Sequence, residues 1–379
     1  MASVVPPEVI MSIFDMTHPP QGTHGIKANS FLPTVALINK SYLNYARRNL
    51  YSEVHLNAPD HGDSCEDTVQ KFMETVANTP LLAAMVRYIH YGGGKAVTED
   101  ETHALSIAIS SCTGLLHLRI FGYDWFAVRN VSQSIMTRPN LETLEISTFT
   151  LMREYTSIFS TLSSFLLMIQ SLSRIRSVII HPQTVGWDRD APDRLSQILV
   201  GACPLLEKFV YGCGDYWDNR HVVALARMAP FVSVLELTGT VTNIRNTGLT
   251  IALEAWSGTL TEMTFHFPLS ELRHGSHDAL GIDDVVTRMP RLRTLRLSTA
   301  FILPTGFLRG PPNLEHLEYT LWQGQFAELT EILQRPSTLP NLKTLSVWQF
   351  GNEGESVALD NNREDLMQLC DGRGLVLIP

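Results

Sequence analysis

The sequence predicts an open α/β solenoid, an irregular stack of repeats with parallel strands on its concave face and helices on its convex face. Three observations support this fold class. A short apolar pattern, L-x-x-L-x-L, recurs along most of the chain, and the segments between its copies place apolar residues at helical spacing. The chain also has 379 residues, which exceeds the usual size of a domain with a single compact core. A linear stack of repeats lengthens a fold without thickening it.

The clearest copy of the pattern spans 290–297, where a proline precedes Leu292, Leu295 and Leu297. The last two leucines are two residues apart, so they lie on one face of a strand and point inward, while the residue between them faces the other way. The first leucine turns the chain into that strand. Ten copies share this form, and their three apolar positions are Val86/Ile89/Tyr91, Leu115/Leu118/Ile120, Leu141/Leu144/Ile146, Ile175/Val178/Ile180, Leu206/Phe209/Tyr211, Val232/Leu235/Leu237, Leu260/Met263/Phe265, Leu292/Leu295/Leu297, Leu314/Leu317/Tyr319 and Leu342/Leu345/Val347.

The segments between the copies are expected to form helices. Before Ile175, for example, apolar residues recur at intervals of four, three, four and three from Ile158 to Leu172. The nine steps from Val86 to Leu342 average about 28 residues, which lies within the range of leucine-rich repeats. One strand and one helix cannot enclose a core alone, but stacked units share one.

The chain divides into four predicted parts. Residues 1–56 lack the repeat pattern and predict a small helical unit that ends in a possible strand. Residues 57–80 hold a polar loop and a linker helix, and residues 81–350 hold the leucine-rich repeats. Residues 351–379 supply a last helix and strand, which we expect to cap the open end of the stack, as solenoids require.

The N-terminal helical unit resembles the F-box, which begins with a helix of the form L-P-x-E-[LIV]-[LIV]-x-x-I-[FL] and continues with helices containing V-C-[RK]-x-[WF] and L-[FY]. The resemblance implies an all-α F-box followed by irregular repeats, the order found in a large fungal group of F-box and leucine-rich-repeat proteins. Val5, Asn39 and Tyr42 stand where the F-box usually has leucine, cysteine and tryptophan. The matching residues are Pro7, Glu8, Val9, Ile10, Ile13, Phe14, Leu37, Ile38, Lys40, Tyr42, Leu50 and Tyr51.

This resemblance implies a non-catalytic adaptor of a cullin-RING (SCF-type) ubiquitin ligase, in which the F-box binds the Skp-type adaptor and the repeats bind the target protein. The alternative is an interaction scaffold whose degenerate F-box packs on the first repeats, with no ligase attached. A unit of about 50 residues cannot bury all of its apolar side chains, so the excess is expected to contact a partner. The expected adaptor-binding residues are Pro7, Val9, Ile10, Ile13, Leu37, Ile38 and Tyr42.

The concave face is the expected site for the target protein. Residues that flank the inward strand positions form this face, and the loops beyond the strands are rich in aromatic residues, which are enriched at the energetic centres of protein interfaces. The expected target-binding residues are Arg119, Phe121, Tyr123, Trp125, Glu145, His181, Trp217, Glu236, His266, Arg296, Glu318, Trp322 and Trp348.

Composition narrows the class of partner. The net charge of −9 and the pI near 5.8 argue against nucleic acid or an anionic membrane, because both require a basic face. No stretch approaches the ~18 apolar residues of a membrane helix, and the N-terminus lacks the features of a signal peptide. We therefore expect a cytoplasmic or nuclear protein, monomeric apart from its ligase complex.

The sequence predicts no cofactor, metal or catalytic residues. The run from Gly92 to Lys95 follows a strand, but it lacks the second glycine and the hydroxyl residue of a P-loop. His274 and His277 lie in a polar loop without the spacing of the helical H-E-x-x-H pattern, and the five cysteines are scattered without C-x-x-C. A repeat-borne hydrolase or nucleotide-binding protein is accordingly the least favoured function.

Overall fold

The computed structural model describes residues 50–57, 65–93, 97–123, 129–149, 161–181, 191–212, 217–238, 246–266, 282–298, 302, 304–322, 325–350 and 356–378. The seven expected adaptor-binding residues lie outside these ranges, as does Trp125. The F-box prediction therefore stays a prediction from sequence.

The described strands form one sheet of twelve strands, arranged in the order in which they occur along the chain. Every neighbouring pair is parallel. This confirms the predicted fold class, because a sequential parallel sheet is what repeats of one strand and one helix produce. The strands are β1 (Glu53–Asn57), β2 (Tyr88–Gly92), β3 (His117–Tyr123), β4 (Thr143–Phe149), β5 (Ser177–His181), β6 (Lys208–Tyr211), β7 (Val234–Thr238), β8 (Glu262–His266), β9 (Thr294–Ser298), β10 (His316–Trp322), β11 (Thr344–Phe350) and β12 (Val376–Ile378).

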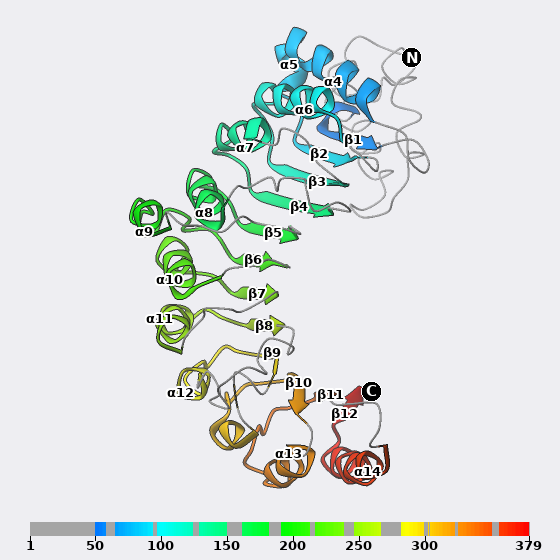
Figure 1. The fold of residues 1–379 in the computed structure, drawn as a ribbon, viewed down its shortest axis with the longest axis vertical. Helices are drawn as coiled ribbons and strands as arrows, with labels where there is room; N and C mark the ends of the chain where they lie inside the picture. Colours follow the sequence, from blue (N-terminus) through cyan, green and yellow to red (C-terminus); the bar gives the residue numbers. More distant parts are fainter. Residues whose placement is uncertain are drawn as a thin grey trace, which may run out of the picture.

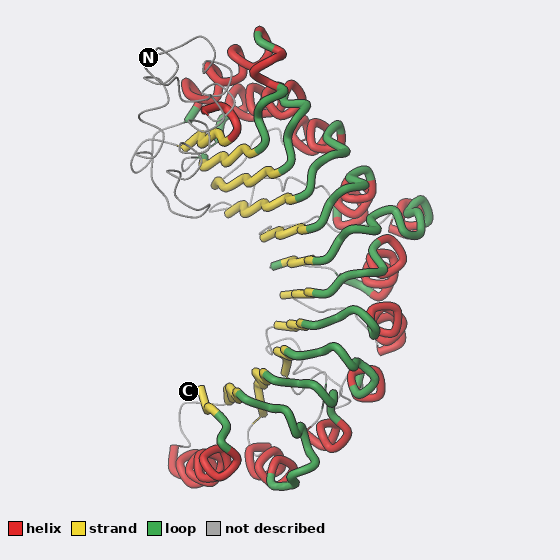
Figure 2. The backbone as a smooth tube through the Cα atoms, turned by 180° about the vertical axis from the view of Figure 1, so that it is seen from behind, coloured by secondary structure: helices red, strands yellow, loops and turns green. Residues whose placement is uncertain are grey.

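The helices follow one side of the sheet, and the whole stack bends into an arc (Figure 1). Figure 2 shows the strands along the inner side of this arc and the helices along its outer side, as predicted. None of the helices in the described ranges is long and apolar enough to span a membrane. The helices are α4 (Glu66–Asn78), α5 (Pro80–Ala83), α6 (Glu99–Ser111), α7 (Arg129–Met136), α8 (Leu162–Gln170), α9 (Ala191–Leu195), α10 (Asn219–Met228), α11 (Asn246–Trp256), α12 (Asp283–Val286), the 3₁₀ helix η2 (Pro304–Arg309), α13 (Gln325–Leu333) and α14 (Ser356–Arg373).

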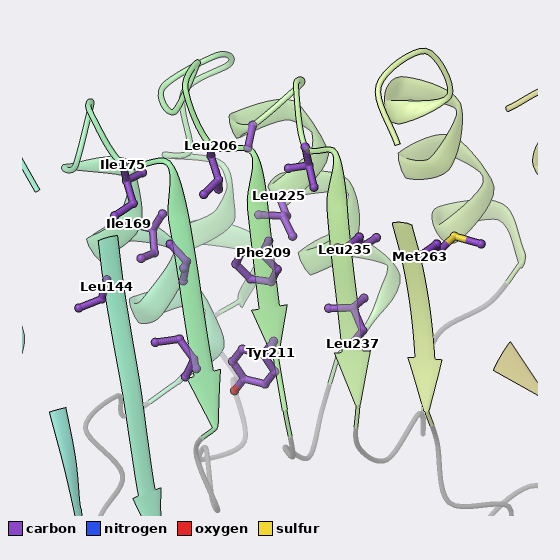
Figure 3. Packing of buried hydrophobic residues seen from close by; sticks show 14 of the residues in the cluster. Leu144, Ile169, Ile175, Leu206, Phe209, Tyr211, Leu225, Leu235, Leu237 and Met263 are labelled. Carbon is purple, nitrogen blue, oxygen red and sulfur yellow. The ribbon is translucent and has the colours of Figure 1, made fainter. Parts of the chain in front are cut away.

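The core lies between the sheet and the helices. The second and third apolar positions of neighbouring copies stand side by side in register, so that Phe209 has Val178 on one side and Leu235 on the other. Figure 3 shows this packing around Phe209 and Tyr211, with Ile169 and Leu225 approaching from the helices α8 and α10. All these side chains are buried. The apolar pattern therefore forms continuous rows of buried residues, and each repeat completes the core of the next.

Backbone hydrogen bonds join each repeat to the one before it. The amides of Glu315 and His316 both donate to the carbonyl of Arg293, and the amides of Lys343 and Thr344 both donate to the carbonyl of Glu315. The same two-to-one arrangement recurs at other turns into the strands. This explains why the two residues between the first and second apolar positions can vary in type, because their main chain makes the contact.

Both ends of the described stack extend beyond the repeat copies recognised in the sequence. Strand β1 pairs with β2, so the expected boundary at residue 56 falls within the first strand of the sheet. Helix α4 buries Val69, Phe72 and Val76, the residues whose spacing predicts a helix there. At the other end, β12 pairs with β11, and α14 lies beside them (Figure 1).

Candidate binding surface on the open face of the sheet

The candidate binding surface is the face of the sheet that is turned away from the helices, which we call the open face. Along each strand the buried positions alternate with residues that point to this face; in β3, for example, Arg119 lies between the buried Leu118 and Ile120. The register of the strands places these residues in a continuous row. The row consists of His55, His90, Arg119, Glu145, Ile179, Val210, Glu236, Thr264, Arg296, Glu318, Ser346 and Ile378.

Two ion pairs cross neighbouring strands within this row. The Arg119 Nε lies 3.1 Å from a carboxylate oxygen of Glu145, and the Arg296 Nε lies 3.3 Å from one of Glu318. All four residues were predicted to contact the target. Their side chains are partly exposed, so solvent screens the attraction and each pair adds at most about 1 kcal/mol to stability. Their main effect is to hold charged groups at fixed positions on the open face.

The middle of the row is poor in charge. Ile179 is half-buried and Val210 is buried, and the next residues along the row are Glu236 and the buried Thr264. The open face therefore has two ion-paired sections separated by four residues, of which only Glu236 is charged. Such a surface suits a protein partner better than a uniformly charged polymer.

The position of Trp217 differs from the prediction that this residue binds the target protein. Its side chain is 1% exposed and packs edge to face against Phe209 and Tyr211, with ring centroids 6.1 and 5.3 Å away. The prediction that it lies on the open rim was wrong, because the indole fills the space between β6 and the start of α10. A large aromatic residue between a strand and a helix serves the core as readily as an interface, and spacing alone does not separate the two roles.

The other predicted target-binding residues fall into two groups. Trp348 is 50% exposed on β11, and Phe121, His181 and Glu236 are half-buried on their strands. Tyr123, His266 and Trp322 end strands β3, β8 and β10, but their side chains lie outside the described part of the structure.

The side chain of His181 lies over Gly212, the residue that follows the neighbouring strand β6. A Cβ atom at Gly212 would be 2.1 Å from the Nδ1 of His181, too close for any real contact. Gly212 thus leaves room for the imidazole ring at this point of the open face. His181 is on the same strand as Ile179, two residues further along, and so lies beside the part of the row that carries little charge.

A cluster of rings at the N-terminal end of the open face was not predicted. Tyr88 lies 5.9 Å from His55, 6.5 Å from His90 and 6.3 Å from His117, measured between ring centroids. Burial raises the pKa of Tyr88, and the nearby Arg119 guanidinium opposes that rise. The expected target-binding residues begin at Arg119 on β3, so they leave out the open-face residues of β1 and β2.

A signal for β1 was present in the sequence. Tyr51, Val54 and Leu56 have the same spacing as the three apolar positions of the repeat. Aligning them one step before Val86 places His55 beside His90. The row then starts at β1, two strands before Arg119.

The helical layer contains a serine, a histidine and an aspartate in a chain of contacts like that of a hydrolytic triad. These residues are Ser163, His221 and Asp218. The His221 Nδ1 is 2.8 Å from Oδ1 of Asp218, and its Nε2 is 3.4 Å from Oγ of Ser163. Ser163 is fully buried in α8, so a substrate has no access to its hydroxyl. Asp218 instead caps α10 by accepting hydrogen bonds from the amides of Arg220 and His221. The arrangement is structural.

The buried cysteines are not candidates for reactive groups. Burial raises the pKa of the Cys65, Cys112 and Cys203 thiols to about 12, so these groups stay neutral and unreactive. Within the described ranges, no group of three or more histidine, cysteine, aspartate or glutamate residues is arranged to hold a metal ion.

Comparisons with known proteins show distant structural similarity only. No family model matches the chain, and no curated protein matches it. The chain is similar to a solved structure described as a crystal structure of a Rad7 and Elc1 complex in yeast, at 13% identity and a TM-score of 0.40. The similarity covers 98% of this chain and 92% of that chain. It is too distant to assign a function.

Proposed function

We propose that this protein is a non-catalytic substrate-recognition adaptor of a cullin-RING, SCF-type ubiquitin ligase. In this proposal, the N-terminal segment binds the Skp-type adaptor, and the open face of the sheet binds the target protein. The observation that carries the proposal is the uninterrupted open face, along which side chains from twelve parallel strands follow one another in register. The protein is proposed to act in the cytoplasm or the nucleus.

The chemistry of the open face supports the target-binding half. Arg119 and Glu145, like Arg296 and Glu318, present opposite charges on neighbouring strands, and the apolar Ile179 and Val210 lie in the row between the two pairs. A protein partner can complement this combination of paired charges and apolar side chains. The rigid sheet holds the side chains in place, so little conformational entropy is lost on binding.

The resemblance of residues 5–51 to the F-box supports the adaptor-binding half. By this resemblance, the residues that correspond to adaptor contacts of an F-box are Pro7, Val9, Ile10, Ile13, Leu37, Ile38 and Tyr42. The substitutions at Val5, Asn39 and Tyr42 favour the second candidate, a scaffold that uses the same open face but recruits no ligase.

Co-purification with a Skp-type adaptor tests the proposal and separates the two candidates. The full chain is expected to retain the adaptor, and an Ile10→Asp/Ile13→Asp double variant is expected to lose it. Arg296→Glu is the matched control, because it changes the open face near the opposite end of the chain and should retain the adaptor. Failure of the wild-type chain to retain any adaptor would reject the ligase role and leave the scaffold.

A further inference from the structure

The His55 and His90 side chains face each other across strands β1 and β2. They are direct neighbours in the parallel register and both lie on the open face, because Leu56, Ile89 and Tyr91 point into the core. The Nδ1 atoms of the two rings are 3.3 Å apart, and the ring centroids are 5.4 Å apart. The two Nδ1 atoms therefore face each other at close range on the open face.

The separation of these nitrogen atoms matches that of two ligands on one tetrahedral metal ion. Zinc–imidazole bonds are about 2.0–2.1 Å long, and two such bonds at the tetrahedral angle place their nitrogen atoms about 3.3–3.4 Å apart. The observed 3.3 Å agrees with this value. It is long for a hydrogen bond between ring nitrogens, since N–H donors usually approach their acceptors to about 2.7–3.2 Å.

A carboxylate orients one of the two rings in the manner typical of metal-binding histidines. The Nε2 of His55 is 2.9 Å from Oε1 of Glu53, which lies two residues earlier on the same face of β1. Histidines that bind a metal through one nitrogen commonly donate the other N–H to a carboxylate, which fixes the tautomer and makes the ligand more basic. Glu53 thereby leaves the Nδ1 of His55 as the nitrogen with a lone pair for a metal.

We propose that His55 and His90 together bind one divalent transition-metal ion of the zinc class through their Nδ1 atoms. The side chain of His55 is 43% exposed, so the remaining coordination positions are reached from the solvent side of the open face. This site does not depend on the proposed ligase function, because both ligands belong to the sheet.

Zinc binding to the metal-free full-length chain, measured by isothermal titration calorimetry, tests the proposal. The wild type is expected to bind one Zn²⁺ in a step that is absent from both His55→Ala and His90→Ala. Glu53→Gln is expected to weaken this step roughly tenfold, the usual effect of removing an outer-shell carboxylate. Co²⁺ provides a second readout, because its visible absorption intensifies in a four-coordinate site and should do so in the wild type but in neither histidine variant.

His316→Ala is the matched control. His316 lies near the other end of the sheet and hydrogen-bonds Thr344 of the next strand, so its removal should leave zinc binding unchanged. Circular dichroism of each variant checks that the fold is retained. A wild type without a one-to-one step, or a step that persists in folded His55→Ala and His90→Ala variants, would overturn the proposal.

Discussion

Tyr211 and Trp217 pack edge to face, with their ring centroids 5.3 Å apart and their planes at 83°. This contact joins the last residue of β6 to the residue that leads into α10, so it connects the two layers of the stack. Both rings are buried. The pair belongs to the core and lies away from the open face.

Trp217→Ala is expected to lower the free energy of unfolding by about 3–5 kcal/mol, the usual cost of removing a large buried aromatic side chain. Trp217→Phe should cost markedly less, because it keeps ring contacts with Phe209 and Tyr211. Urea denaturation followed by circular dichroism measures both losses. Wild-type stability in the alanine variant would show that the indole does not fill the core.

Asp218 is expected to make stability depend on pH in the acid range. Burial opposes ionisation, but hydrogen bonds from His221 and Arg220 outweigh it and hold the pKa of Asp218 below its usual value near 3.8. Because the folded-state pKa lies below the unfolded one, the carboxylate stabilises the fold above about pH 4 and loses that effect as the pH falls further.

Asp218→Asn tests this dependence without removing the helix cap, since asparagine also caps helices well. The variant should be about 1.5–3 kcal/mol less stable than wild type at pH 7, as expected for loss of hydrogen bonds to a charged group. The difference should shrink as the pH drops below about 4. Denaturation midpoints across this pH range measure it, and a constant difference would contradict the assignment.

Gly212→Ala is expected to destabilise the protein by about 1–3 kcal/mol through overpacking. The added methyl group would overlap the Nδ1 of His181, and the ring would have to leave its place beside Gly212. In a His181→Ala background the same change should cost much less, because the obstacle is gone. A double-mutant cycle on unfolding free energies checks this, and equal costs in the two backgrounds would place the strain elsewhere.

The pair Arg119 and Glu145 is expected to contribute little to stability. A double-mutant cycle with Arg119→Ala and Glu145→Ala should give a coupling energy of about 0.2–1 kcal/mol, because both side chains are partly exposed. The coupling should fall further in about 1 M salt, where screening is strong. A coupling of several kcal/mol would assign the pair a structural role and weaken its place in the target site.

The repeat pattern predicted the fold well because it reflects burial directly. Phe209 and Tyr211 follow Leu206 at the expected spacing, and the structure buries all three in the predicted orientation. The pattern gives less information about the binding surface, because side chains on the open face contact solvent and need not be apolar. Trp217 shows the limit of this prediction. It lies between a strand and a helix, where no regular spacing of apolar residues distinguishes a buried position from an exposed one.

The His55–His90 pair shows a second limit. Each histidine is ordinary in its own strand, and only the register between β1 and β2 brings the two Nδ1 atoms together. Sequence spacing within one repeat contains no information about that register. Recognising Tyr51, Val54 and Leu56 as a repeat copy would have supplied it.

The hydrogen bonds in which two amides of one turn share a carbonyl of the turn before connect each repeat only to its neighbours. Each described strand between β1 and β12 depends on the strand on either side of it, so a disturbance passes outward one neighbour at a time and weakens with distance. Loss of the final helix and strand would fray the arc locally and leave the far tip in place. Evolution can therefore remodel one tip of such a protein while the other keeps its partner.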